Sequence, residues 1–340
     1  YKGTSAAGSP FSGTGSALDF GLITSSGTYT VVAANATSGC TASMSGSAAV
    51  TVNPLPVAYN VNGGGSYCYS GSGVPVGLTG SETSVNYQLY RGTTTVGSPV
   101  SGTGAALSFG SQATAGSYAV QAVNTITGCT SAMTGTSAVS VNALPSVYSV
   151  TGGGAYCSGS GGVAIGLSNS QTGISYQLYK GGAASGTTVS GTGSTISFGL
   201  KTVADTYTVV ATNTTSGCTA SMNGYSVIQV NSVPVVVSVT GGGGYCAGGA
   251  GVSVGLSGSC IGTNYQLYRG TNTVGSPLAG VGYGLDFGLQ TTAGNYKVVA
   301  INPTTGCTTN MNDSAAVTIN PVPTITASQF TLAPAGSLSL

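Results

Sequence analysis

The sequence predicts an all-β fold made of small β-sandwich domains in tandem, and three observations carry this prediction. Short alternating segments rich in Val, Ile, Thr and Tyr are separated by turns rich in Gly, of which there are 58 among 340 residues. No segment shows the 3.6-residue apolar period of an amphipathic helix. Residue types recur at a step of 89, as in Met44, Met133, Met222 and Met311. This step is too long for solenoid repeats and suits a whole domain.

The domain boundaries are predicted from four equivalent links that contain proline, at 53–56, 142–145, 231–234 and 320–323. Proline fixes φ and biases the preceding residue toward extended structure, so these links are expected to be short and stiff. The pattern predicts complete domains at 56–144, 145–233 and 234–322, a partial C-terminal part of a domain at 1–55, and the start of a further, divergent domain at 323–340. The chain is thus expected to be a window of a longer polypeptide with its domains in an extended array.

Six strands are expected within the domain 145–233, where β-prone residues alternate between turn residues, at 147–150, 163–167, 174–179, 195–198, 206–213 and 226–231. Six or seven short strands in a domain of this size indicate an immunoglobulin-like sandwich. The segment Ala-Gly-x-Tyr-x-Val at 293–298 resembles the tyrosine-corner strand of that fold.

The expected core is aliphatic and contains Tyr and Phe. The usual inter-sheet cysteine, two residues after the corner tyrosine, is replaced by Val31, Val120, Val209 and Val298. The usual tryptophan is missing, and its place is expected to be taken by Leu89, Leu178 and Leu267. A domain of this size buries a modest core, so an additional cross-link is expected.

The eight cysteines offer two pairing schemes. Three pairs share a constant offset of 61 and predict one disulfide within each domain: Cys68–Cys129, Cys157–Cys218 and Cys246–Cys307. The alternative pairs share an offset of 28 and cross the links: Cys40–Cys68, Cys129–Cys157 and Cys218–Cys246. Loop entropy gives about 4 kcal/mol for either scheme. We prefer the first because each domain can then fold alone, and it leaves Cys40 and Cys260 unpaired. Paired cysteines indicate an oxidising, extracellular setting.

Charge and composition argue against several classes of function. Six Lys and Arg cannot supply the clustered cations that nucleic-acid binding needs. The chain has no His, so His-based catalysis and His-ligated metals are excluded. No apolar run is as long as a membrane-spanning helix requires, so no membrane span is expected. The five acidic residues occupy mostly different repeat positions and offer no clear glycosidase pair. We therefore expect no enzyme, no metal and no cofactor.

Three recurring surface features have alternative interpretations. Lys2, Arg91, Lys180 and Arg269 occupy one repeat position and are either a regularly spaced cationic contact point or, as we favour, solubilising charges at a sheet edge. The Gly triplets, as at 152–154, lack the Lys and helix of a phosphate loop and are expected to form a bend or bulge before a cysteine. Paired tyrosines such as Tyr176 and Tyr179 are expected to face opposite sides of their strand, one of them in the core.

These motifs together resemble a known repeat class. The run Tyr-x-Val-x-Gly-Gly-Gly-x-Tyr-Cys, followed by Tyr-Gln-Leu-Tyr and Gly-Cys-Thr, is seen at Tyr148–Asn231 and, with small changes, at Tyr59–Asn142. It resembles the immunoglobulin-like repeats of giant secreted surface adhesins of Bacteroidota, which include gliding-motility adhesins and other type IX secretion cargo. The resemblance implies an extracellular protein of the cell surface. It also implies neighbouring domains or other copies of the chain, surface polysaccharide and the secretion machinery as partners.

The expected function is that of a non-enzymatic structural repeat region, a stalk or filament that projects or mediates adhesion. Exact periodicity, short proline links and the lack of a catalytic constellation favour this interpretation. Two alternatives remain open at this point: a multivalent array of polysaccharide-binding modules, or a spacer attached to a secreted enzyme.

Overall fold

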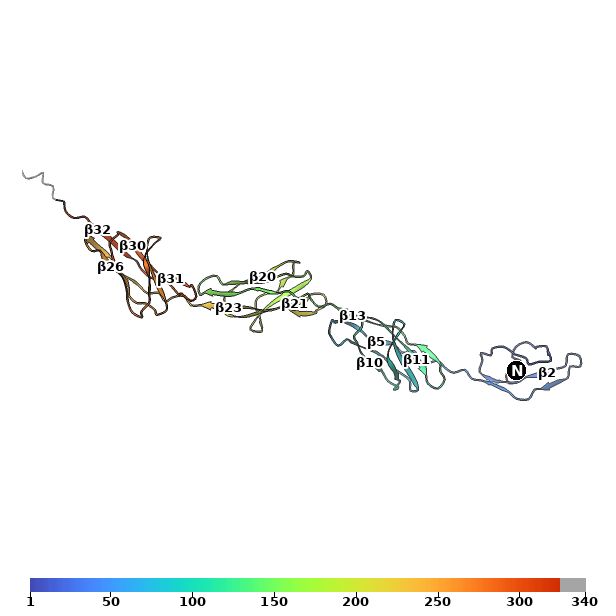
Figure 1. The fold of residues 1–340 in the computed structure, drawn as a ribbon. Helices are drawn as coiled ribbons and strands as arrows, with labels where there is room; N and C mark the ends of the chain where they lie inside the picture. Colours follow the sequence, from blue (N-terminus) through green and yellow to red (C-terminus); the bar gives the residue numbers. More distant parts are fainter. Residues whose placement is uncertain (325–340) are drawn as a thin grey trace, which may run out of the picture. The chain divides into compact units, whose positions relative to one another are not determined.

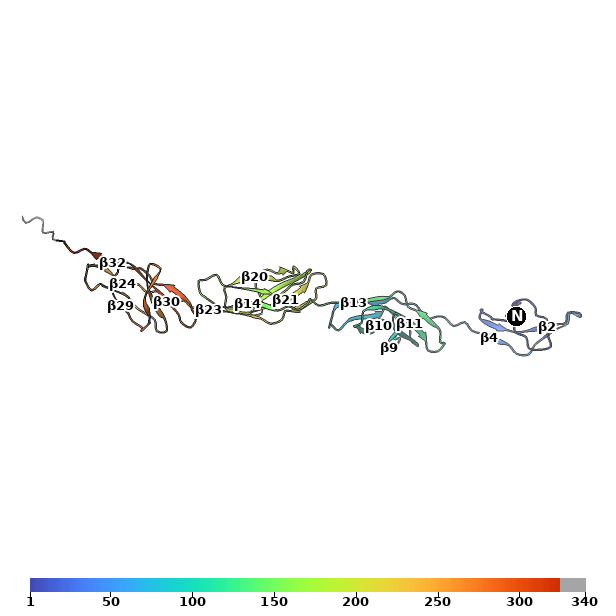
Figure 2. The same ribbon diagram turned by 45° about the horizontal axis from the view of Figure 1, so that its top comes forward.

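The computed structural model describes residues 1–324, which form strands and loops without a helix (Figures 1 and 2). The prediction of an all-β sandwich fold is confirmed. The chain divides into two compact units, one from Tyr1 to Leu144 and one that begins at Pro145. The divergent domain predicted at 323–340 lies, apart from its first two residues, outside the described residues.

Residues 1–55 form two small antiparallel sheets and bury no side chain. Their strands are β1 (Gly27–Tyr29), β2 (Val32–Ala34), β3 (Thr41–Ser43) and β4 (Ala48–Val50), paired as β1–β4 and β2–β3. In the repeat these strands correspond to the last part of a sandwich, and neither of the two small sheets buries Tyr29 as the corner tyrosines of the complete sandwiches are buried.

The first sandwich, within 56–144, consists of two sheets with the strand orders β10-β7-β5 and β6-β13-β11-β8-β9, and β12 pairs with β11. The pairing of β6 with β13 is parallel and the others are antiparallel. Its strands are β5 (Val61–Gly63), β6 (Gly65–Cys68), β7 (Val74–Leu78), β8 (Val85–Arg91), β9 (Thr94–Ser101), β10 (Leu107–Gln112), β11 (Gly116–Asn124), β12 (Thr130–Ala132) and β13 (Ser137–Asn142).

The second sandwich, within 145–233, repeats this topology, with β20 in one layer and β21 and β23 in the other (Figure 1). Its three-stranded sheet has the order β14-β16-β20, and the larger sheet has the order β15-β23-β21-β17-β18. Its strands are β14 (Val150–Gly152), β15 (Gly154–Cys157), β16 (Val163–Leu167), β17 (Ile174–Lys180), β18 (Ala183–Ala184), β19 (Val189–Ser190), β20 (Ile196–Lys201), β21 (Asp205–Asn213), β22 (Thr219–Ser221) and β23 (Ser226–Asn231).

The third sandwich, within 234–322, has the sheets β24-β26-β29 and β25-β32-β30-β27-β28. Its strands are β24 (Val239–Gly241), β25 (Gly243–Cys246), β26 (Val252–Leu256), β27 (Asn264–Arg269), β28 (Asn272–Ala279), β29 (Leu285–Gln290), β30 (Gly294–Ile301), β31 (Thr308–Asn310) and β32 (Ala315–Asn320). β25 pairs in parallel with β32, as β15 does with β23.

The glycine triplet is the point at which the first strand of a sandwich changes sheet. β14 belongs to the three-stranded sheet, and β15, only one residue further on, belongs to the other. Gly152 has φ +85°, and a Cβ on it would lie 2.1 Å from the Ala164 carbonyl oxygen, so only glycine fits there. The bend expected before Cys157 is confirmed, and it brings the cysteine alongside the last strand.

Each sandwich has its own apolar core between the sheets. In the second sandwich, Leu178 and Val209 are buried at the positions of the usual tryptophan and cysteine, as the sequence predicts. Tyr176 is fully buried and Tyr179 is half-buried, which confirms that the two face opposite sides of β17.

The corner tyrosine ties the loop before its strand to the core. In the second sandwich, the Tyr207 hydroxyl donates to the Val203 carbonyl oxygen at 3.0 Å, four residues upstream. Tyr118 and Tyr296 make the equivalent bonds at 2.7 and 2.9 Å. This is the tyrosine corner predicted from Ala-Gly-x-Tyr-x-Val.

Candidate functional site

The candidate site is the covalent joint between the second and third sandwiches. Cys157 of β15 forms a disulfide with Cys307, which lies between β30 and β31. Their Cα atoms are 5.6 Å apart and their sequence separation is 150. The bond therefore joins two consecutive sandwiches instead of closing a loop within one.

Cys157 is placed at the C-terminal end of its sandwich. β15 runs parallel to the last strand, β23, with Cys157 opposite Asn231. The ladder continues one residue further, because the Ser158 backbone N–H donates to the Asn231 carbonyl oxygen at 2.8 Å. Since Asn231 begins the link to the next sandwich, Cys157 lies beside the point at which the chain leaves.

Cys307 is placed at the N-terminal end of the next sandwich by a tight turn. The Asn302 side-chain oxygen accepts from the backbone N–H groups of Thr304 and Thr305 at 3.0 and 3.2 Å. The Asn302 backbone N–H donates to the Cys307 carbonyl oxygen at 2.9 Å. Such an Asx turn fixes the backbone without a regular strand. Cys307 has 0% of its surface exposed.

The predicted pairing of Cys157 with Cys218 and of Cys246 with Cys307 is wrong, and so is the alternative of Cys129 with Cys157. The reason is strand direction. Cys157 is level with the end of β23, whereas Cys218 follows the far end of β21, which has nine residues. A strand of that length spans about 30 Å, and a disulfide needs Cα atoms within about 7 Å.

The remaining cysteines differ in state. Cys129 and Cys246, which we expected in disulfides, are free thiols, and so are Cys40 and Cys260. Cys68 and Cys218 are disulfide-bonded, and Cys129, the predicted partner of Cys68, is not that partner. Cys40 and Cys246 are exposed, whereas Cys129 and Cys260 are half-buried.

The four equivalent basic residues lie one in each repeat, opposite the corner tyrosine. Arg91 pairs in register with Tyr118, Lys180 with Tyr207 and Arg269 with Tyr296, and Lys2 forms a single β-bridge with Tyr29. The three in the complete sandwiches are half-buried, and Lys2 is exposed. The aliphatic part of Arg91 lies close over Gly116, where a Cβ would come within 2.8 Å of it. A stem that covers a glycine in this way leaves only the guanidinium group for a contact with a partner.

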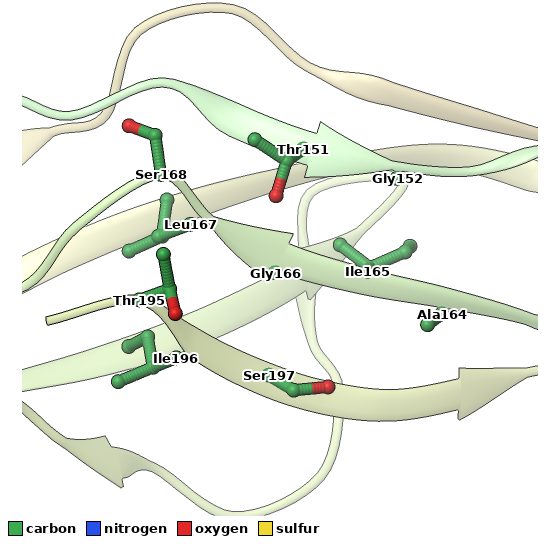
Figure 3. Close-up of a pocket in the computed structure, with 10 residues that line it drawn as sticks. All are labelled: Thr151, Gly152, Ala164, Ile165, Gly166, Leu167, Ser168, Thr195, Ile196 and Ser197. Carbon is green, nitrogen blue, oxygen red and sulfur yellow. The ribbon is translucent and has the colours of Figure 1, made fainter.

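Two surface hollows carry little chemistry. One, of about 290 Å³, lies over the three-stranded sheet of the second sandwich. Figure 3 shows that the side chains around this hollow are small or apolar or carry a hydroxyl group, as on Ile165, Ser168 and Thr195. The other, of about 520 Å³, is lined by Tyr67, Tyr69 and Val141 among others. Neither lining includes a carboxylate, a thiol or a cation.

The acidic side chains are dispersed. Within residues 1–324, no three Asp, Glu or Cys side chains come together in a way that could hold a metal ion. Asp286 accepts from the Ser253 hydroxyl at 2.6 Å and from the Gly288 backbone N–H at 2.8 Å. These two bonds, the hydroxyl first, lower the pKa of Asp286 below its ordinary value. The carboxylate serves to hold β29 to β26.

Residues 1–324 contain no helix with the length and apolar character that a membrane span requires.

Comparison with known proteins assigns no family. No family model matches the chain, and no curated protein matches it. Similar solved structures include Sidekick-1 immunoglobulin domains 1–5, with 14% identity over 87% of this chain and 67% of that one and a TM-score of 0.30. The three N-terminal domains of the bacteriophage RB49 Hoc capsid protein have 15% identity over 78% and 99%, with a TM-score of 0.30. Chicken CNTN1 FN1–FN3 has 14% identity over 78% and 99%, with a TM-score of 0.26. Likenesses this weak indicate nothing about function.

Proposed function

We propose that this chain is a non-enzymatic, extracellular structural repeat region, a stalk whose second and third sandwiches are clamped to each other by a disulfide. The observation that carries the proposal is the bond between Cys157 and Cys307. A catalytic or binding domain gains no chemistry from a disulfide that joins it to its neighbour. A stalk does gain, because the joint between the second and third sandwiches then has two covalent connections, the link at 231–234 and the disulfide.

The joint also determines where tension would run. A pull along the chain would enter the second sandwich at Pro145, follow β14 and β15 to Cys157, and cross the disulfide to Cys307. The segment between the two cysteines includes most of both apolar cores, for example Leu178 and Leu267. These cores would bear little of the force, because the covalent path through the disulfide would carry it.

The setting and partners follow from the same chemistry. Disulfides persist in oxidising compartments, so the stalk would work outside the cell. The residues that connect one sandwich to another come from the repeat itself, so neighbouring domains of the same chain are its first partners. A place on the surface of a Bacteroidota cell, in gliding or another adhesion process after type IX secretion, is the finer form of the proposal that the sequence motifs support.

Small-angle X-ray scattering of the full, oxidised chain tests the stalk. A compact globule of 340 residues would have a radius of gyration of about 20 Å. We expect a value well above that, with a pair-distance distribution that has a long tail. The variant Cys157→Ser should keep the large radius and show greater flexibility at one joint. A radius near that of a globule would overturn the proposal.

A further inference from the structure

The second sandwich contains an Asn-Gly pair between two of its strands, at Asn223 and Gly224. Asn-Gly is the dipeptide at which a protein backbone most readily attacks its own side chain, because glycine has no Cβ to shield its nitrogen from the neighbouring amide. The other repeats have at this position Ser45-Gly46, Thr134-Gly135 and Asn312-Asp313. The chain has one further Asn-Gly pair, at Asn62 and Gly63 in the first sandwich, and it serves as an internal comparison.

The surroundings of Asn223 leave its side chain and the next backbone nitrogen free to meet. Asn223 and Gly224 are both exposed, and within residues 1–324 neither the Asn223 side chain nor the Gly224 backbone N–H makes a hydrogen bond. A Cβ on Gly224 would have no atom within 4 Å. Gly224 and Tyr225 lie between β22 and β23, so the backbone after Asn223 can rotate without disturbing a strand.

Asn62 and Gly63 have the same chemistry in a fixed setting. Both are exposed too, so access to water does not distinguish the two sites. They belong to β5 and lie in register with Gly77 and Val76 of β7. The Asn62 side-chain oxygen would be 2.9 Å from a Cβ on Gly77, and a Cβ on Gly63 would be 2.2 Å from a carbonyl oxygen of β7, that of Pro75. Rotation of Asn62 toward the next nitrogen would therefore break strand pairing.

The backbone of Asn223 fastens the start of the second sandwich to its last hairpin. The Asn223 N–H donates to the Tyr148 carbonyl oxygen at 2.8 Å, and the Asn223 carbonyl oxygen accepts from the Val150 N–H at 2.9 Å. These two bonds, which form a parallel bridge at Ser149, are called the latch below. A change in backbone length at Asn223 would displace the acceptor that Val150, the first residue of β14, uses.

We propose that Asn223 is a site of spontaneous deamidation, which converts it to aspartate and isoaspartate and opens the latch. The Gly224 backbone nitrogen loses its proton and attacks the side-chain amide carbon of Asn223. A C–N bond forms, and the amide nitrogen leaves as ammonia. Water then opens the resulting succinimide ring, so that one water is consumed for each ammonia released and no oxidant or enzyme is needed.

The two products differ in their backbone. Opening of the ring at the side-chain carbonyl gives aspartate, whereas opening at the backbone carbonyl gives isoaspartate, in which the main chain runs through the side chain of residue 223 and is one carbon longer. Either product adds one negative charge, so the formal net charge of the chain falls from +1 to 0. Only isoaspartate moves the carbonyl group that accepts from Val150.

The modification does not depend on the proposed function, whereas its consequence for a stalk does. In a stalk, a pull would enter the second sandwich at Pro145 and pass along β14, and the latch is what holds β14 at its start. An isoaspartate there would let this strand yield sooner. The two proposals fail separately, because scattering measures the shape of the chain and peptide mapping measures the amide.

Peptide mapping by mass spectrometry tests the modification. The full, oxidised chain is kept folded in warm, mildly alkaline buffer, a second sample is kept in urea, and pepsin digests of both are followed over time. In the folded chain Asn223 should deamidate about ten times faster than Asn62, or more, because exposed turns open far more readily than paired strands. In urea the two sites should react at similar rates, because their dipeptides are identical.

Two results would overturn the proposed site. One is an equal rate at Asn223 and Asn62 in the folded chain. The other is an Asn223 that stays intact in the folded chain while it reacts in urea.

Hydrogen exchange of the aged protein tests the latch. The Val150 amide should exchange faster in aged wild type than in fresh wild type, in proportion to the isoaspartate content measured by chromatography of the peptides. The matched control is Asn223→Thr, which carries the residue that the first sandwich has at Thr134, and its exchange should not change with age. Unchanged exchange at Val150 in wild type that contains isoaspartate would overturn the opening of the latch.

Discussion

Removal of the joint between the second and third sandwiches should lengthen the unfolded chain by a fixed amount. The sequence separation of Cys157 and Cys307 is 150, and a fully extended chain spans about 3.3–3.6 Å per residue. The double variant Cys157→Ser, Cys307→Ser should therefore extend about 500–540 Å further than the wild type, a gain set by about 150 released residues.

Single-molecule force spectroscopy measures this gain directly. Handles attached at Ser146 and Thr324, both exposed, enclose the joint and allow the full chain to be used. In the wild type only 146–157 and 307–324 can extend, about 100 Å in total. Reduction of the wild type during the pull should release the same additional length in one step. The variant Cys260→Ser, which removes a thiol outside the joint, should behave as the wild type.

The reasoning would be refuted if the oxidised wild type extended as far as the double variant. It would also be refuted by a gain of less than half the expected length, which would indicate a bond within one sandwich. A bulk measurement gives a second check, because the chain-entropy model assigns about 5 kcal/mol to a cross-link that closes a loop of this length. Loss of the bond should lower the denaturant midpoint of the two joined sandwiches accordingly.

Three further outcomes are expected from the sandwich itself. In urea denaturation, Gly152→Ala should destabilise the second sandwich clearly more than Gly159→Ala. Both glycines have φ near +85°, but only at Gly152 would the new Cβ meet a carbonyl oxygen, that of Ala164, at 2.1 Å. Equal losses of stability would contradict this steric argument. Tyr207→Phe should cost about 1 kcal/mol at neutral pH through loss of the bond to the Val203 carbonyl oxygen, and no change would show that water replaces it. Burial first, and then nearby Asp205, raises the pKa of Tyr207 above its ordinary value. The contribution of Tyr207 to stability is therefore complete below about pH 10 and falls as pH rises further, because the tyrosine ionises first in the unfolded state. The free energy of unfolding should accordingly fall less steeply with rising alkaline pH in Tyr207→Phe than in the wild type. Identical pH profiles would rule this out.

The sequence predicts the regular part of each sandwich well, because alternation of apolar and polar residues is a local signal. In the second sandwich, β16 and β23 have the bounds expected from the pattern at 163–167 and 226–231. β15 was not predicted, because Gly154–Cys157 has no alternation of its own and becomes a strand only by pairing with β23. The glycine triplet indicated a bend, and strand pairing determines that this bend transfers the chain to the other sheet.

The joint could not be predicted for a related reason. Constant offsets between cysteines show that a pattern of bonds repeats, but offsets of 61, 28 and 150 all satisfy the same period. The choice depends on which end of the sandwich holds each cysteine, and this depends on the direction of β15 and β21 within their sheet. The parallel pairing of β15 with the last strand, β23, is the information that the cysteine spacing does not contain.

The placement of the two cysteines at opposite ends of a sandwich has a consequence for how such genes evolve. Every complete repeat carries one cysteine at the repeat position of Cys157 and one at the repeat position of Cys307, so any repeat offers the same two cysteines as any other. Unequal recombination that duplicates or deletes one whole repeat would leave every internal junction with a complementary pair. The length of the array can therefore drift between lineages while its covalent continuity is inherited unchanged.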